Sequence, residues 1–381
     1  MPRRLVYPKQ FLKSVPPPEQ WDRRPLPNLL HPIDPVTGEQ ECERIERWYR
    51  EMNSKEKTHL KRQLRSMRFR EYWSAYHELI TARIARSFGA LSIRHAAVLA
   101  GRRPDFTVTF SSGTQIWEVA TAYQTLNREA DDDKAHELAR RLNSEFKHRW
   151  RVVVEAERFG PGGVSLSKAI PKIQAWLDRL DAGGPVRITL RPPIINCDLS
   201  LRAHRPGQSA EPRPIVSALM GQGGNVTATD QLKNVLRKKI RKYGSVKAKA
   251  APLIVFLYEG NWLHISRESL ENALLGELLV TFRVGRKAAP LSLAPGGLFL
   301  PGPDGRHQNT RLSAVVYGRR EWRDGAPHAR LFVYHHPAAQ HPVPLEQFES
   351  LAQCRITIGD TDITQQWTAE PDGEIQTLPL T

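Results

Sequence analysis

The chain has 381 residues with 40% hydrophobic side chains and a mean hydropathy of −0.48, values typical of a soluble globular protein. Its length exceeds that of one small domain, so we expect two units or one enlarged α/β domain. The longest apolar runs, such as PLIVFLY at 252–258, fall far short of the ~20 residues that a membrane-spanning helix needs. No apolar signal segment opens the chain, and its three scattered cysteines form no Cys-x-x-Cys pair. These features predict a reduced, cytoplasmic protein without a membrane anchor.

The chain is strongly basic. It carries 56 Lys and Arg residues against 40 Asp and Glu, which gives a formal net charge of +16. Such an excess favours a polyanionic partner, because neutralising phosphates releases condensed counterions. An Arg-rich proteome would produce the same excess without any such partner. The charge therefore points to nucleic acid but says nothing about catalysis.

The N-terminal region divides into an arm and two helices. Residues 1–38 are rich in proline and predict an extended arm. Residues 39–67 are mostly charged with one apolar helical stripe, and residues 69–88 predict a second helix that ends at Gly89. The apolar positions recur at helical spacing: Ile45, Trp48, Tyr49 and Met52 in the first stretch, and Phe69, Trp73, Tyr76, Ile80 and Ile84 in the second.

After a short strand at 91–98, residues 102–121 (RRPDFTVTFSSGTQIWEVAT) predict two strands joined by a turn at SSGT. Side chains alternate across a strand, so a turn of two or four residues gathers the apolar side chains on one face. That face carries Phe106, Val108, Trp117 and Val119. The same register places Asp105 beside Glu118 on the other face. A turn of three or five residues would split the aromatic residues and separate the two acids.

Two adjacent carboxylates on one sheet face repel each other unless a cation lies between them. Carboxylate oxygens suit Mg²⁺, which binds one or two of them together with waters and substrate phosphates. The other interpretation is that Asp105 and Glu118 are solvated acids at the rim of a sheet. Both interpretations stay open at this stage.

The rest of the chain alternates helices and strands, a pattern typical of a mixed α/β fold. A loop rich in Gly, Pro and Ser is expected at 203–228. The expected helices are 131–148, 167–180 and the very basic 231–244, and the expected strands are 151–157, 186–193, 194–204, 252–258, 312–318 and 329–339.

The stretch that contains Pro104-Asp105 and Glu118 resembles the PD-(D/E)xK, or restriction-endonuclease-like, nuclease superfamily. The core of that family runs helix, three strands, helix, strand, and its motif is Pro-Asp followed by Glu-x-Lys on the next strand. The resemblance implies that Asp105 and Glu118 hold Mg²⁺, or Mn²⁺ in its place, with the Val119 carbonyl as a further ligand. It also implies an acid on the preceding helix, and Glu78 matches that acid by position, on a stripe of small residues.

The resemblance covers residues 66–122 and, more weakly, the helix and strand at 229–258, which look like the pair that closes the family's core. This assignment makes 122–228 a large insertion. The competing assignment takes the helix at 131–148 and the strand at 151–157 as the closing pair.

The fold class that the resemblance implies is α/β, with a restriction-endonuclease-like core. The predicted domains are a Pro-rich arm and charged helical extension at 1–66, the nuclease core at 67–260, and a C-terminal α+β elaboration at 261–381.

The lysine of the family motif is missing, because Ala120 stands where Glu-x-Lys requires it. Thr121 is no substitute, since it points to the opposite face. Either a cation comes from another element, a shift that the family tolerates, or the site no longer cleaves. Lys239 is the first candidate, because it sits within the apolar stripe of the basic helix, and Lys134 is a weaker one. The apolar neighbours of Lys239 at helical spacing are Leu232, Val235, Leu236, Ile240 and Tyr243.

The remaining cations of the basic helix are candidates for contacts with nucleic-acid phosphates. A solvated helix face is the alternative interpretation of the same residues. They are Lys233, Arg237, Lys238, Arg241 and Lys242.

Together these features predict a Mg²⁺-dependent nuclease with Asp105, Glu118 and Lys239 as its catalytic residues, and with DNA favoured over RNA as substrate. The resemblance implies a role in phage defence or DNA processing. A nucleic-acid-binding module with a degenerate, non-cleaving core is the rival that Ala120 favours. A scaffold subunit of a larger complex is the rival that the Pro-rich arm and the C-terminal third favour. Protein partners and a homo-oligomer also stay open.

Overall fold

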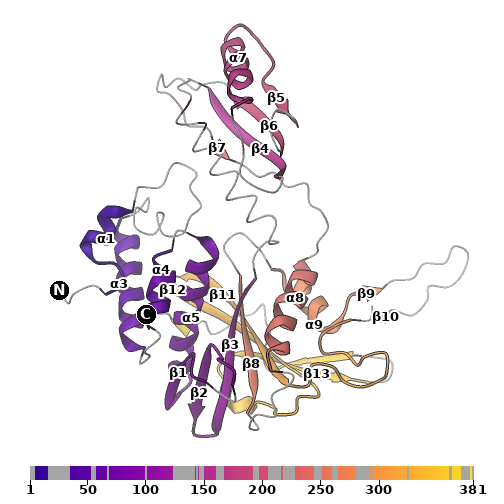
Figure 1. Cartoon of the computed structure of the whole chain (residues 1–381). Coiled ribbons are helices and arrows are strands. Elements are labelled where there is room, and N and C mark those ends of the chain that lie inside the picture. Colours follow the sequence, from indigo (N-terminus) through magenta and orange to yellow (C-terminus); the bar gives the residue numbers. More distant parts are fainter. Residues whose placement is uncertain are drawn as a thin grey trace, which may run out of the picture. The chain divides into compact units, whose positions relative to one another are not determined.

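The structure is a computed structural model of the whole chain (Figure 1). The residues that it describes are 5–15, 35–52, 57–66, 68–98, 101–122, 142, 145, 150–159, 167–191, 197–204, 216–217, 228–243, 251–259, 265–279, 292–293, 296–323, 326–359, 363–369 and 378–379.

Contacts within the chain separate two compact units. The first consists of residues 1–16, 24–123 and 227–381, and the second of residues 17–23 and 124–226. The second unit therefore lies mainly within the segment predicted to be an insertion. The predicted boundaries near residues 66 and 260 fall inside the first unit and separate no units.

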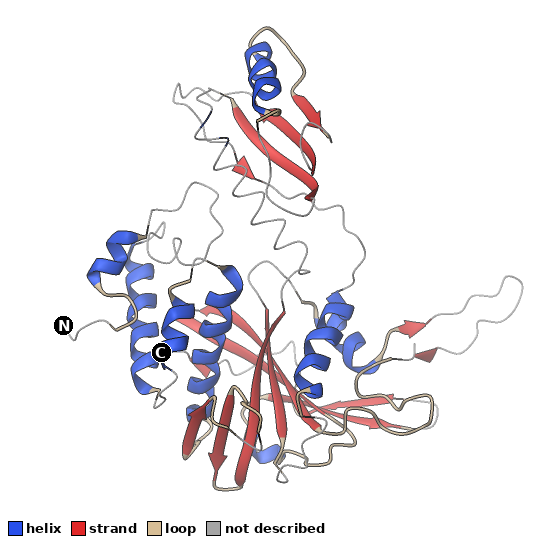
Figure 2. Ribbon diagram, in the orientation of Figure 1, coloured by secondary structure: helices blue, strands red, loops and turns tan. Residues whose placement is uncertain are grey.

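The first unit is built on one large mixed sheet (Figure 2). Its described strands lie in the order β1 (Ser92–His95), β2 (Phe106–Phe110), β3 (Gly113–Ala122), β8 (Leu253–Glu259), β11 (Leu312–Arg323), β12 (Ala326–His335), β13 (Ala352–Ile358) and β14 (Ile363–Trp367), and β15 (Leu378–Pro379) pairs with β12. Strands β1, β2 and β3 are antiparallel neighbours, whereas β8 runs parallel to both β3 and β11. The predicted mixed α/β fold class is confirmed.

Helices cover both faces of this sheet, and each face has its own apolar core. On the face that we call the α5 face, the core is shared by the helices α3 (Pro35–Glu51), α4 (Lys57–Leu64) and α5 (Phe69–Ser87). On the opposite face, the α8 face, the core includes α8 (Ala228–Arg241) and α9 (Arg267–Leu275). Because side chains alternate along β3, Trp117 joins the α5-face core and Ile116 joins the α8-face core.

The helices lie close to their predicted positions. The charged stretch at 39–67 contains two helices, α3 and α4, and its apolar stripe faces inward. Helix α5 is followed by Gly89 with a φ of 77°, a left-handed conformation that favours glycine at a helix end. The predicted apolar positions that are buried include Ile45, Trp48, Tyr49, Met52, Tyr76, Ile80 and Ile84.

The N-terminal segment at 5–15, with the short helix α1 (Lys9–Ser14), is bound to α3 and α4. The backbone N–H groups of Leu5, Val6 and Tyr7 each donate to the Glu46 carboxylate at 2.7 Å. Val6 and Tyr7 are fully buried, so these bonds compensate for the loss of water around the backbone. The Pro-rich residues 16–34 lie outside the described part of the chain.

The pairing of β3 identifies its parallel neighbour. That neighbour is β8, which follows α8, so the strand at the end of the predicted pair 229–258 belongs to this sheet and the helix packs on its α8 face. The competing strand, β4 (Arg151–Phe159), pairs with other strands of the second unit, so the competing assignment is wrong. The C-terminal third is also no separate elaboration, because β11 extends the same sheet beyond β8. Its smaller elements are β9 (Leu278–Leu279), which pairs with β10 (Ser292–Leu293), and the 3-10 helix η1 (Leu345–Phe348).

The second unit has a smaller sheet in the order β5 (Arg187–Leu190), β6 (Cys197–His204), β4 and β7 (Val216–Ser217). Helix α7 (Ile170–Leu180) contributes Ile173 and Trp176 to its core. Almost all of the helix predicted at 131–148 lies outside the described residues, as does most of the loop predicted at 203–228.

Among the residues that the structure describes, no helix has both the length and the apolar character needed to cross a membrane.

Candidate active site

The β2–β3 hairpin brings the two predicted acids to one face of the sheet. Phe110 pairs with Gly113, so the turn has two residues, and Phe106 pairs with Trp117. This register continues to place Asp105 beside Glu118, as the hydrophobic pattern predicted. The backbone carbonyl of Asp105 accepts a hydrogen bond from the Ala96 N–H at 3.0 Å, which ties the start of β2 to the end of β1.

Helix α8 brings a lysine to these acids. The Lys239 Nζ atom lies 2.7 Å from Asp105 Oδ2 and 2.7 Å from Glu118 Oε2. The apolar residues around Lys239 anchor the helix: Leu232, Leu236, Ile240 and Tyr243 are buried in the α8-face core. The ammonium therefore reaches the sheet from an apolar helix face, at the position that the sequence predicts for a relocated lysine.

Two further donors on the same stretch bind Glu118. The Lys242 Nζ atom lies 2.7 Å from Glu118 Oε1, and the Tyr243 hydroxyl donates to the same oxygen. The Glu118 side chain is fully buried, whereas Asp105 keeps 21% of its side chain exposed. Both oxygens of Glu118 are thus engaged, and the acid pair is matched by two ammonium groups.

The surroundings shift the pKa values of the two acids in opposite directions. Burial, helped by the neighbouring Asp105 carboxylate, raises the pKa of Glu118 above its ordinary value. Burial also acts to raise the pKa of Asp105, but the Lys239 ammonium and the Val119 N–H, 2.7 Å from Asp105 Oδ2, hold it below its ordinary value. Asp105 is therefore the more acidic of the two residues.

The donors are shifted as well. Burial acts to lower the pKa of Lys239, but the two carboxylates raise it above its ordinary value, so Lys239 stays charged at neutral pH. Burial and the Glu118 carboxylate raise the pKa of Tyr243, so its hydroxyl keeps the proton that it donates.

The positions after Glu118 agree with the predicted alternation. Ala120 is buried in the α8-face core, where the motif lysine would stand. Thr121 faces the other way, because its hydroxyl lies 2.8 Å from His77 Nδ1 on α5. The cation at this site therefore comes from α8 and not from β3.

Glu78 does not join the acid pair. Its Oε2 atom lies 2.6 Å from His95 Nε2, and His95 pairs with Phe106 of the α5-face core. Helix α5 covers the face opposite Glu118, so the prediction that Glu78 approaches the metal ligands is wrong. A stripe of small residues indicates a close approach of the helix but not which face of the sheet it covers.

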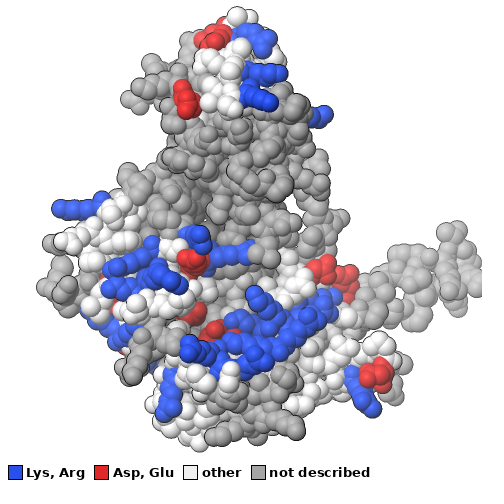
Figure 3. All heavy atoms as spheres, viewed as in Figure 1, with Lys and Arg blue, Asp and Glu red and all other residues white. Residues whose placement is uncertain are grey.

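The other predicted cations of α8 divide into two groups. Lys242 is an ion-pair partner of Glu118, so its assignment to phosphate binding alone needs correction. Lys238 and Arg241 are exposed, and Lys233 and Arg237 are half-buried. Figure 3 shows Lys and Arg side chains gathered in a band over α8, with acidic side chains beside it. Lys134, the weaker candidate, lies outside the described residues.

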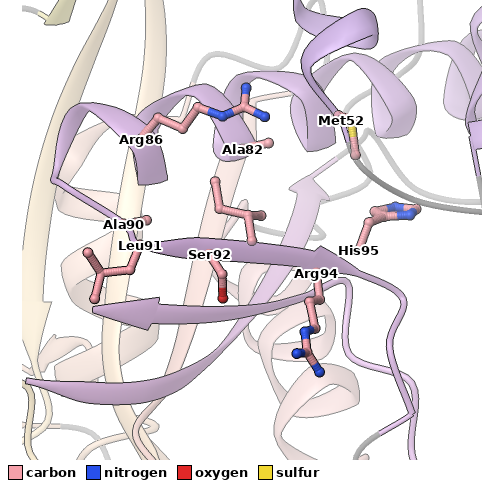
Figure 4. Close-up of a pocket in the computed structure, with 9 residues that line it drawn as sticks. Met52, Ala82, Arg86, Ala90, Leu91, Ser92, Arg94 and His95 are labelled. Atoms are coloured by element: carbon pink, nitrogen blue, oxygen red, sulfur yellow. The ribbon is translucent and has the colours of Figure 1, made fainter. Parts of the chain in front are cut away.

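The α5 side of β1 carries a separate cavity of about 360 Å³. Figure 4 shows Arg86 and His95 at this cavity, with Arg94 extending from β1 to the opposite side. Arg86 is paired with Glu51 and His95 with Glu78, so these two groups are already engaged within the protein. The lining residues are Met52, Ala82, Arg86, Ala90, Leu91, Ser92, Ile93, Arg94 and His95.

Sequence reasoning missed the contacts of Lys242 and Tyr243 with Glu118. The signal was present, because these residues follow Lys239 by three and four positions and so share its side of the helix. Charge alone groups Lys242 with its exposed neighbours, and the apolar pattern alone marks Tyr243 as a core residue.

The residues at the acid pair fit a hard divalent cation. One small cation, the Lys239 ammonium, already contacts both carboxylates, and carboxylate oxygens are the ligands that Mg²⁺ prefers. Within the described part of the chain, no three His, Cys, Asp or Glu side chains converge on one point. A metal bound here would therefore complete its coordination with backbone, water or substrate oxygens.

No protein-family model, curated protein or solved structure matches the chain. The comparisons therefore add no evidence on its function, which has to be argued from the site itself.

Proposed function

We propose that this protein is a Mg²⁺-dependent nuclease of the PD-(D/E)xK type that hydrolyses phosphodiester bonds, with DNA ahead of RNA as its substrate. The observation that carries the proposal is the position of the Lys239 Nζ atom, 2.7 Å from a carboxylate oxygen of both Asp105 and Glu118. Two acids and one lysine are the side chains that the family motif requires. Once the second unit between β3 and α8 is set aside, the order α5, β1, β2, β3, α8, β8 also matches the order of elements in that family's core.

Asp105 and Glu118 would hold the metal, with Mn²⁺ able to replace Mg²⁺. When bound, the ion would polarise the attacking water and the scissile phosphate. Asp105 is suited to this role because it is the more acidic and the more accessible of the pair, and both of its described side-chain contacts use Oδ2. Glu118 is held in one orientation by its three donors on and next to α8.

Lys239 would act as a point charge beside the reacting phosphate. An ammonium stabilises the negative charge that develops there, and its effect depends on its position rather than on which strand or helix supplies it. Lys242 offsets the second carboxylate, so removal of Lys239 would still leave one ammonium against two acids.

The second candidate function is nucleic-acid binding without cleavage. It is favoured by the complete burial of Glu118, whose oxygens are all occupied by protein donors. In that case the lysines would be permanent partners of the acids, and the basic surface of α8 would be the functional part of the protein.

A cleavage assay separates the two. We expect the purified protein to cut single- or double-stranded DNA or RNA in Mg²⁺ or Mn²⁺ and not in EDTA. Asp105→Ala should lower the rate by at least about 10³-fold, because a metal ligand is removed. Glu268→Ala, which removes an exposed acid on α9, should cut like the wild type. Absence of cleavage on every substrate would leave the binding function, and cleavage unaffected by Asp105→Ala would exclude this site.

A further inference from the structure

The α8-face side of β1 and β2 forms an uninterrupted polar surface beside the acid pair. Arg94 pairs with Thr107, which pairs with Ile116, and Ser92 pairs with Thr109, which pairs with Thr114. Paired residues of antiparallel strands point to the same side, so all of these side chains share the face of Glu118. We call Ser92, Arg94, Thr107, Thr109 and Thr114 the hairpin surface.

Three residues of the hairpin surface are open to solvent, and the other two, Thr107 and Thr109, are half-buried. Ser92, Arg94 and Thr114 are exposed, whereas His95 and Phe106, on the α5 face of the same strands, are buried. Figure 4 shows Arg94 extending from β1 to the side opposite Arg86 and Met52. The Thr109 and Thr114 hydroxyls lie 3.2 Å apart, which places two hydrogen-bonding groups next to each other on this surface.

The segment that leads up to Asp105 carries only positive charges. Between Gly89 and Pro104 the chain has three arginines, Arg94, Arg102 and Arg103, and no Asp or Glu. The strands from Phe106 to Trp117 carry no charged residue at all. Arg94 and Arg102 are exposed, so their guanidinium groups are accessible to a ligand.

The acid pair therefore has cations on both sides. On one side are the lysines and arginines of α8, and on the other is Arg94, while Arg102 lies in the segment between β1 and β2, three residues before Asp105. Arg94 is on β1, two strands away from Glu118 on β3, which corresponds to roughly 10 Å across the sheet. A nucleic-acid strand that crosses the sheet at the acid pair would therefore also pass Arg94.

We propose that the hairpin surface, with Arg94 and Arg102 as its cations, is a second phosphate-binding surface, and that the nucleic acid lies across the acid pair between it and α8. The inference rests on the proposed function for the meaning of the acid pair. It adds that the bound strand continues on both sides of the scissile phosphate. The substrate class is therefore an internal phosphodiester bond of a continuous strand, so the protein cuts nucleic acid that has no free end.

The binding test needs no cleavage. A fluorescent single-stranded DNA 30-mer is titrated in EDTA at several salt concentrations against the wild type, Arg94→Ala, Arg102→Ala and the double variant. Arg355→Ala, which removes an exposed arginine on β13, is the matched control. We expect each variant to reduce the slope of log affinity against log salt by about 0.7, the value for one neutralised phosphate of a single strand, and the double variant by about twice as much.

A double variant whose slope and affinity equal those of Arg355→Ala would overturn the second phosphate-binding surface. The cutting test uses circular single-stranded DNA and closed circular duplex DNA with Mg²⁺. We expect wild type to open at least one kind of circle, and Arg94→Ala/Arg102→Ala to open it several-fold more slowly. Cleavage of linear DNA only, from its ends, would overturn the inference. If neither DNA nor RNA is cut but the salt slope falls as expected, the proposed nuclease function fails while the phosphate-binding surface stands.

Discussion

Glu46 and Glu118 are both almost completely withdrawn from water, with 3% and 0% of their surfaces exposed. Their donors differ in kind. Glu46 accepts three backbone N–H groups, from Leu5, Val6 and Tyr7. Glu118 accepts side-chain donors only in its described contacts, two lysines and a tyrosine, and has a second acid beside it.

The difference shows what each buried charge can do. Backbone N–H groups are fixed by the path of the chain, so the donors of Glu46 leave only if the N-terminal segment detaches. Lysine ammonium groups end flexible stems, so the two lysine donors of Glu118 can move aside while the helix stays in place. Burial alone therefore does not mark a functional acid. The proposed function depends instead on a buried acid that has a second acid beside it and movable cations as partners.

The largest effect that this comparison predicts is on stability at Glu46. Glu46→Ala leaves three buried backbone N–H groups without their acceptor, so the free energy of unfolding should fall by about 3 kcal/mol, as measured by denaturant unfolding. Glu43→Ala, an exposed acid on the same helix, is the control and should change it by less than about 0.5 kcal/mol.

Glu46→Ala should leave the cleavage rate unchanged at temperatures where the variant is folded. A large loss of cleavage with little loss of stability would contradict the assignment of Glu46 as a structural acid.

The next effect is on catalysis at Lys239. Lys239→Ala should lower the rate of cleavage by on the order of 10²-fold, because it removes the charge that faces both acids, while the affinity for DNA in EDTA stays nearly constant. Lys13→Ala, which removes an exposed lysine on α1, is the matched control and should change neither the rate nor the affinity.

A second substitution sharpens the Lys239 test. Ala120 occupies the motif position on the same face as Glu118, so Ala120→Lys in the Lys239→Ala background should restore part of the rate. A silent Lys239→Ala in an otherwise active enzyme would show that another residue supplies the charge.

The local part of the site could be predicted from the sequence because it depends on alternation. Phe106 and Trp117 had to share a face, and that requirement alone set the register that joins Asp105 to Glu118. The interruption of an apolar helical stripe by Lys239 likewise indicated a cation directed at the sheet. In both cases a few neighbouring residues carry all the information.

The rest depends on interactions between distant segments. Nothing near Glu78 tells which face of the sheet α5 covers, so its pairing with His95 could not be foreseen. The pairing of β8 with β11 joins segments that are more than 50 residues apart, so local patterns alone present the C-terminal third as an elaboration although it extends the central sheet. The roles proposed for Asp105, Glu118 and Lys239 in cleavage remain predictions.

A smaller effect is expected on DNA binding, where the cations on and next to α8 should differ in how much each contributes to the salt dependence of the affinity. The variants are Arg237→Ala, Lys238→Ala and Arg241→Ala, made singly and together. Each should reduce the slope of log affinity for duplex DNA against log salt by about 0.9 for each phosphate that it no longer neutralises. Lys242→Ala should change this slope less than any of these three single variants, because its ammonium is held by Glu118. Equal changes from all four residues would mean that Lys242 leaves Glu118 when DNA binds.

The smallest predicted effect concerns Tyr243, which we assign as a positioning residue for Glu118. Tyr243→Phe removes one of the three donors to that carboxylate and should cost about 1 kcal/mol of stability. Because Glu118 is then less firmly oriented, the Mg²⁺ concentration that gives half the maximal cleavage rate should rise by about tenfold, the low end of the loss expected when a support of a metal ligand is removed, since two lysines still hold Glu118. Tyr317→Phe is the matched control, since its hydroxyl donates to Glu259 at the end of β8, away from the acid pair. It should lose similar stability with no change in the Mg²⁺ requirement. If Tyr243→Phe leaves that requirement as unchanged as Tyr317→Phe does, the two lysines alone orient Glu118. Glu118 would then differ from Glu46 only in having lysine donors that can move.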